Sequence, residues 1–119
     1  MAIQIFGTAK SQNARKARMW FKERRIPAQF LDIRERPMSA GEFESVLACI
    51  TKAEGSREAA IAALTDDTAK DYAAIAYLDD SEKAAKLLEQ QSLLRLPIVR
   101  NGKSAATAGL CPSVWETWR

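Results

Sequence analysis

The chain begins with a short apolar strand, a helix and a second short apolar strand, and this order constrains the fold most. Residues 2–6 read as a short buried strand, and Ser11 is a suitable N-cap for the helix that follows. The apolar helix positions at helical spacing are Ala14, Ala17, Trp20 and Phe21. Pro27 enforces the end of this helix, and a second strand is expected over 28–33. Two such strands pair in parallel across a right-handed crossover.

A helical insertion is predicted over residues 40–91. It begins at a capping box made by Ser39 and Glu42, and Gly55 ends its first helix. The alanine-rich remainder favours helix. Further short helices are expected over 57–64, 68–78 and 81–90. Their candidate N-caps are Ser56, either Asp66 or Asp67, and Ser81.

The last part of the chain, "LPIVRNGKSAATAG", reads as strand, turn, strand. Asn101-Gly102 is the preferred dipeptide of a two-residue type I′ hairpin, so these strands are antiparallel. Cys111 then precedes a short final helix with Pro112 at its first position. We therefore predict one α/β domain over 1–119 (α+β by some schemes). Its mixed sheet of four strands, in the order β-α-β, helices, β-β-α, is the arrangement of the thioredoxin-like fold.

Composition excludes several kinds of chemistry. The chain has 119 residues, no histidine and two cysteines, Cys49 and Cys111, which lie far apart. Without an imidazole there is no Ser-His-Asp or Cys-His catalytic device, and neither a metal site nor a structural disulfide is expected. No apolar stretch has the length of a membrane span, and the N-terminus lacks the apolar core of a signal peptide. We expect a cytoplasmic monomer.

Positive charge is concentrated in one helix. Residues 15–25 carry six lysines and arginines against the single Glu23, although the net charge of the chain is only +3. Such a face can meet nucleic acid, an anion or an acidic partner, but most often it is simply solvated. A net charge of +3 is small for nucleic-acid binding, so we rank that function last.

Three stretches carry a family resemblance. They are "IQIFGT…SQNARKARMWFKERRIPAQFLDIRERPMSAGEF", "LLRLPIVRNGK" and "AGLCPSVWETW". In order and spacing they resemble the glutaredoxin-coupled arsenate reductases and the related Spx transcriptional regulators. The resemblance covers essentially the whole chain. It implies a thioredoxin-like fold with a cis bond between Leu96 and Pro97.

The sequence departs from this family at the residues that do its chemistry. With the basic helix in register, Ser11 stands at the nucleophilic cysteine, and Ala14 at the second cysteine of Spx-type members. The family's arginine in the middle helical block has no counterpart near 67–69. The arginine before the proline is replaced by Leu96, and Arg95, one position earlier, would point differently. A serine hydroxyl does not ionise near neutral pH as such a thiol does, so we assign no catalytic residue with confidence.

Although the family's cysteine and arginines are absent, the loop before the basic helix still leads into a helix N-terminus. Its backbone N–H groups and the helix dipole favour an anion, so glutathione or an oxyanion is a candidate occupant. The candidate ligand-binding residues are Thr8, Lys10, Ser11, Gln12, Asn13, Arg15, Arg95 and Pro97. Alternatively, Ser11 is an N-cap and nothing more. Cys111 could be a thiol of lowered pKa at a helix start, but an inert, partly buried cysteine is the favoured interpretation.

Two functions stay open. The first is a binding or regulatory module without thiol redox activity, whose protein partner, by analogy with Spx, would be the RNA polymerase α-subunit. The second is a glutathione- and glutaredoxin-dependent arsenate reductase-type oxidoreductase. In that case the nucleophilic cysteine has been replaced by Ser11, or another thiol such as Cys111 takes its place. We favour the first.

Overall fold

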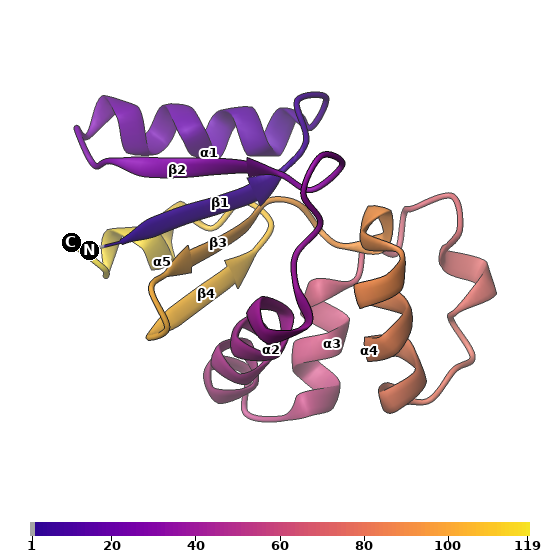
Figure 1. Ribbon diagram of the computed structural model, residues 1–119. Helices are drawn as coiled ribbons and strands as arrows, with labels where there is room; N and C mark the ends of the chain where they lie inside the picture. The colour runs from indigo at the N-terminus through magenta and orange to yellow at the C-terminus, as the bar shows by residue number, and fades with distance from the viewer. Residues whose placement is uncertain (1) are drawn as a thin grey trace.

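The computed structural model describes residues 2–119 and is shown in Figure 1. Its elements are β1 (Ile3–Gly7), α1 (Gln12–Glu23), β2 (Ala28–Asp32), α2 (Ala40–Glu54), α3 (Arg57–Leu64), the 3₁₀ turn η1 (Tyr72–Ala74), α4 (Asp80–Glu89), the 3₁₀ turn η2 (Gln91–Leu93), β3 (Ile98–Asn101), β4 (Ala105–Ala108) and α5 (Pro112–Glu116). Within the described residues, no helix is long and apolar enough to cross a membrane.

The four strands form one mixed sheet in the order β2-β1-β3-β4. β1 pairs with β2 in parallel, and β3 runs antiparallel to both β1 and β4. This confirms the predicted thioredoxin-like α/β arrangement. Because β2 pairs only with β1, it is an open edge of the sheet.

Alternation along the strands divides the core between the two faces of the sheet. On one face, Ile5 and Val99 pack with α1 and with Trp115 of α5. On the other face, Phe6 and Ile98 pack with the helices of the insertion, which gather below the sheet in Figure 1. Two apolar clusters, one on each face of the sheet, therefore hold the helices against it.

Gly7, the last residue of β1, allows α1 to approach the sheet closely. A Cβ atom at this position would lie 2.8 Å from the Cβ of Ala14, which is shorter than any ordinary carbon–carbon contact. Ala14 and Ala17 are both buried against the sheet. Small residues on both sides of the contact thus fix where α1 begins.

Most predicted helix ends are confirmed. Ser11 caps α1, Ser56 caps α3, and Ser39 with Glu42 forms the complete capping box of α2. Gly55 ends α2 with a φ of +93°, a left-handed conformation that glycine adopts without strain. The cap of α4 differs from the prediction, because the Asp79 side chain accepts the capping hydrogen bond at 2.8 Å in place of Ser81.

The predicted helix over 68–78 is wrong, since the segment holds only the single 3₁₀ turn η1. The backbone N–H and the hydroxyl of Thr68 both donate to the Asp66 carboxylate, at 3.0 and 2.6 Å. The backbone bonds that follow span three residues, as from Ala69 to Asp66 and from Tyr72 to Ala69. Local side-chain bonds of this kind compete with a regular helix.

The hairpin between β3 and β4 is wider than predicted. Asn101 pairs with Ala105, so three residues form the loop, and only Gly102 among them has a positive φ. Ser104 donates to the Asn101 carbonyl from its backbone N–H and from its hydroxyl, at 3.1 and 2.8 Å. These two bonds stabilise the wider loop, so the two-residue type I′ turn does not form.

We predict that Gly7→Ala lowers the free energy of unfolding by about 1–3 kcal/mol, because the added methyl group overpacks the contact with Ala14. Gly41→Ala is the matched control, since a Cβ at this α2 position meets nothing within 4 Å. It should leave stability unchanged or raise it by up to about 1 kcal/mol. Urea denaturation of the two variants measures the difference, and equal stabilities would contradict this account of the contact.

Candidate functional site

The first turn of α1 lies beside the end of β1 and presents Ser11. Its Oγ accepts a hydrogen bond from the backbone N–H of Ala14 at 3.1 Å, and its own N–H donates to the Thr8 carbonyl at 3.2 Å. Ser11 is half-buried. The hydroxyl therefore acts as the N-cap of α1.

A cleft of about 370 Å³ opens in front of this turn. The residues that line it are Ser11, Gln12, Asn13, Asp66, Ser92, Leu94 and Leu96. They come from the start of α1, from the turn after α3 and from the segment before β3. A backbone bridge between Thr65 and Leu94 joins the last two segments. Sequence-distant parts of the chain thus form one site.

Pro97, a predicted site residue, does not line this cleft, although its neighbour Leu96 does. The peptide bond between Leu96 and Pro97 is cis, and Pro97 is buried. A Cβ atom built on Gly7 would lie 4.0 Å from the Cβ of Pro97. The proline therefore lies close to the end of β1, next to the loop that leads into α1.

The cleft carries a negative charge, whereas the sequence predicts positively charged residues there. Among the described residues that line it, Asp66 is the only charged one. Asp66 and the first residues of α1 thus line the same cleft. The helix end favours a negative ligand group, whereas Asp66 favours a positive one.

The cations proposed for this site lie elsewhere. Lys10 is exposed in the loop and does not line the cleft. Arg15 donates from Nε to the Ala9 carbonyl at 3.0 Å and lines a separate groove against β2. Thr8 is half-buried but does not line the cleft either. Of the polar candidates, only Ser11, Gln12 and Asn13 are gathered in the cleft.

Arg95 points away from the cleft. Its Nη2 donates to the Thr65 carbonyl at 3.0 Å, and its side chain passes beside Gly109. The cause is the extended backbone of this segment, in which alternate residues point in opposite directions. Leu94 and Leu96 line the cleft, so Arg95 between them does not.

Sequence reasoning missed Asp66, Ser92 and Leu94 as site residues. The sequence suggests Asp66 only as a helix cap, because its place in the cleft depends on long-range pairing. Its N–H donates to the Leu93 carbonyl at 2.8 Å. The sequence signal that indicates Asp66 is the polar run Asp-Asp-Thr after an apolar helix, because the chain turns back toward the sheet at such a position.

Neither cysteine lines the cleft. Cys111 precedes α5, where its Sγ lies 3.3 Å from the Ala108 carbonyl, and Cys49 is on α2 with its Sγ 3.4 Å from the Lys103 carbonyl. Burial raises the pKa of the Cys111 thiol above its ordinary value. The interpretation of Cys111 as a thiol of lowered pKa is therefore wrong. The cysteine is partly buried, as the favoured interpretation has it, and its low reactivity stays a prediction.

Comparisons with known proteins find the likeness in solved structures. No family model and no curated protein sequence matches the chain. An ArsC-family related protein from Bacteroides fragilis is similar with a TM-score of 0.81 at 16% identity, covering 100% of this chain and 98% of that one. The arsenate reductase from Vibrio cholerae gives 0.79 at 21% identity, with 98% and 97% covered.

An arsenate reductase-related protein from Brucella melitensis is also similar, with a TM-score of 0.69 at 17% identity over 99% of this chain and 94% of that one. The fold is that of arsenate reductase-related proteins. The likeness extends over the full described chain, including the helical insertion between β2 and β3. At these identities it establishes the fold, and the chemistry must be argued from this chain's own residues.

We predict that Cys111 reacts slowly with iodoacetamide at pH 8 in the folded protein, and several-fold faster in urea, where burial no longer raises its pKa. The raised pKa also makes stability depend on pH, because the folded state holds the thiol proton more tightly than the unfolded state does. The resulting contribution to the free energy of unfolding is present below the ordinary thiol pKa of about 8.5 and is lost as the pH rises above it. A Cys49→Ala background isolates the reaction. Equal rates in the folded and unfolded protein would contradict the assignment.

Proposed function

We propose that this protein is a binding module with an arsenate reductase-type fold and that it does not carry out thiol redox chemistry at the start of α1. The observation that supports this is the Ser11 hydroxyl, which caps α1 in a cleft that no cysteine of the described residues lines. The fold thus presents the helix end and a hydroxyl, but no sulfur.

Electron balance separates this proposal from the reductase alternative. Reduction of arsenate needs two electrons, and two thiols supply them when the sulfur that attacked arsenic and the sulfur of a second thiol join in a disulfide. An oxygen nucleophile at Ser11 has no corresponding step. A serine also needs a general base, which in this chain cannot be a histidine. The cleft therefore supports binding better than it supports arsenate reduction.

The ligand that best fits the charges of the cleft is glutathione. Its carboxylates suit the N–H groups at the start of α1, and its ammonium group suits the carboxylate of Asp66. An oxyanion such as arsenate would meet the same helix end but would be repelled by Asp66. We propose that Ser11, Gln12 and Asn13 hold a carboxylate of this zwitterion.

We predict that S-methylglutathione shifts the backbone amide signals of residues 11–13 in NMR titrations. The methylated thiol cannot exchange with Cys49 or Cys111, so the shifts report binding alone. Asp66→Asn keeps the acceptor for Thr68 and should weaken binding about two- to fivefold, as loss of an exposed ion pair would. Asp67→Asn, which removes the same charge outside the cleft, is the control.

The same titration distinguishes the oxyanion. If arsenate binds the wild-type cleft more tightly than S-methylglutathione, and Asp66→Asn has no effect, then the proposed ligand is wrong.

We predict that Ser11→Cys introduces a thiol that reacts faster with iodoacetamide at pH 7 than Cys111, because it stands at a helix N-terminus. The variant should nevertheless not reduce arsenate, since none of the described residues that line the cleft is an arginine. Arsenate-dependent oxidation of glutathione is the measurement. Turnover by the unaltered protein that disappears in Cys111→Ser would refute the binding-module proposal.

A further inference from the structure

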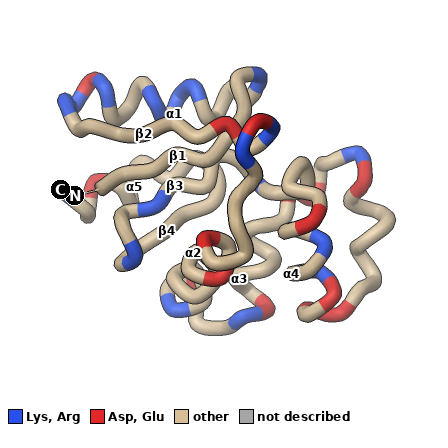
Figure 2. Tube along the Cα trace, viewed as in Figure 1, with Lys and Arg blue, Asp and Glu red and all other residues tan. Residues whose placement is uncertain are grey.

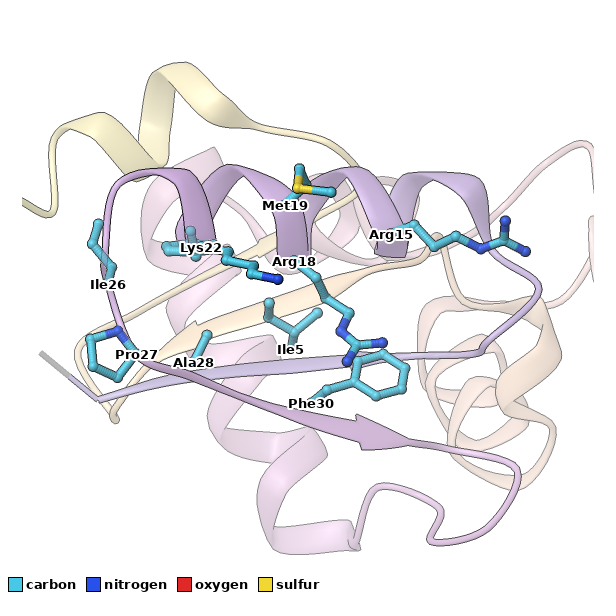
Figure 3. A pocket seen from close by; sticks show the side chains of 10 residues that line it. Ile5, Arg15, Arg18, Met19, Lys22, Ile26, Pro27, Ala28 and Phe30 are labelled. Carbon is cyan, nitrogen blue, oxygen red and sulfur yellow. The ribbon is translucent and has the colours of Figure 1, made fainter.

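A second groove, of about 580 Å³, runs between α1 and the edge strand β2 (Figure 3). The residues that line it are Ile5, Arg15, Arg18, Met19, Phe21, Lys22, Ile26, Pro27, Ala28 and Phe30. It shares no residue with the Ser11 cleft. Its floor is apolar and its helical rim is basic, so it combines two kinds of surface.

The basic rim consists of Arg15, Arg18 and Lys22. Their spacing places them along one side of α1 over about 10 Å. Within residues 2–119 none of the three forms an ion pair, and no acidic residue lines the groove. Figure 2 shows the positive charge that α1 carries. This row of uncompensated cations is complementary to an acidic ligand.

The apolar floor gives the groove a place for an uncharged side chain. Phe30 is half-buried and lies under the Arg18 guanidinium, at 4.3 Å from the ring centroid. Figure 3 shows Ile26, Pro27 and Ala28 at the other end. Met19 is 53% exposed at the rim. An occupant thus has an apolar contact beside each cationic one.

The opposite wall of the groove is an open sheet edge. β2 pairs only with β1, so alternate N–H and C=O groups of its backbone face away from the sheet. Ala28 and Gln29 are exposed, and the only charged residue of the strand is Asp32 at its end. An extended polypeptide is the ligand that supplies matching backbone groups to such an edge.

We propose that the groove between α1 and β2 binds an extended, acidic segment of a partner protein that adds a strand beside β2. Its carboxylates pair with Arg15, Arg18 and Lys22, and an apolar side chain two residues from a carboxylate, on the same face of the added strand, packs on the floor at Ile26 and Phe30. A nucleic acid would use the charges but not the strand edge. A membrane would need more exposed apolar surface than Met19 provides.

The test uses a short fluorescein-labelled peptide with serine at every second position and glutamate and leucine alternating at the positions between, so that both lie on one face of the added strand. Fluorescence anisotropy is the readout. We expect saturable binding that weakens with salt. The double variant Arg18→Glu, Lys22→Glu should weaken it more than tenfold. The matched control is Lys10→Glu, Lys16→Glu, which makes the same change in net charge at exposed positions outside the groove and should lose less than threefold.

Two further measurements test the other parts of the proposal. A peptide in which serine replaces leucine should bind about tenfold more weakly, because the apolar floor is then unused. The amide signals of residues 28–31 should shift when the alternating peptide binds, and circular dichroism checks that each variant is folded.

Several results would overturn the proposal. Equal losses in the two double variants would mean that only net charge matters. Shifts at α1 without shifts along β2 would exclude strand addition. Binding of polyuridine or of phosphatidylserine vesicles, with no binding of the peptide, would assign the groove to a different class of partner.

Discussion

The contact between the end of β1 and the first turn of α1 positions the functional surfaces of this protein. Gly7 and Ala14 approach so closely that one additional methyl group does not fit between them. This contact fixes the height and direction of α1 over the sheet. The end of β1 also lies close to Pro97, which comes from the C-terminal part of the chain. The start of α1, which lines the cleft, follows directly from this contact.

One helix then serves three surfaces. Ala14, Ala17 and Phe21 are buried in the core with Trp115. The N-terminal end of the helix lines the Ser11 cleft, and a third side carries the basic rim over β2. These roles do not compete, because a helix presents positions three and four apart on one side. A ligand in the cleft and a partner strand in the groove are therefore compatible.

The sequence predicts what local patterns determine. Strand alternation, the Ser11 and Ser39 caps and the Pro112 helix start all depend on neighbouring residues, and each is confirmed. The charge of the cleft was not predictable in this way. Asp66 enters it through pairing with Leu93, and Arg95 is turned out by the alternation of an extended segment. The Asp66 contact joins segments distant in sequence, which local spacing does not encode, whereas the orientation of Arg95 follows from local alternation.

Because of Asp66, replacing the Ser11 oxygen by a cysteine sulfur would not by itself turn this cleft into a reductase site. A cysteine at position 11 would have its pKa lowered by the helix end, and a carboxylate in the same cleft would reduce that effect without removing it. An arriving oxyanion would meet the same carboxylate without an arginine to offset it. Replacing Asp66 together with Ser11 would remove the carboxylate that opposes thiol ionisation and repels the oxyanion. The charge of the cleft, as much as the absent sulfur, therefore favours a zwitterionic ligand over a thiol reaction.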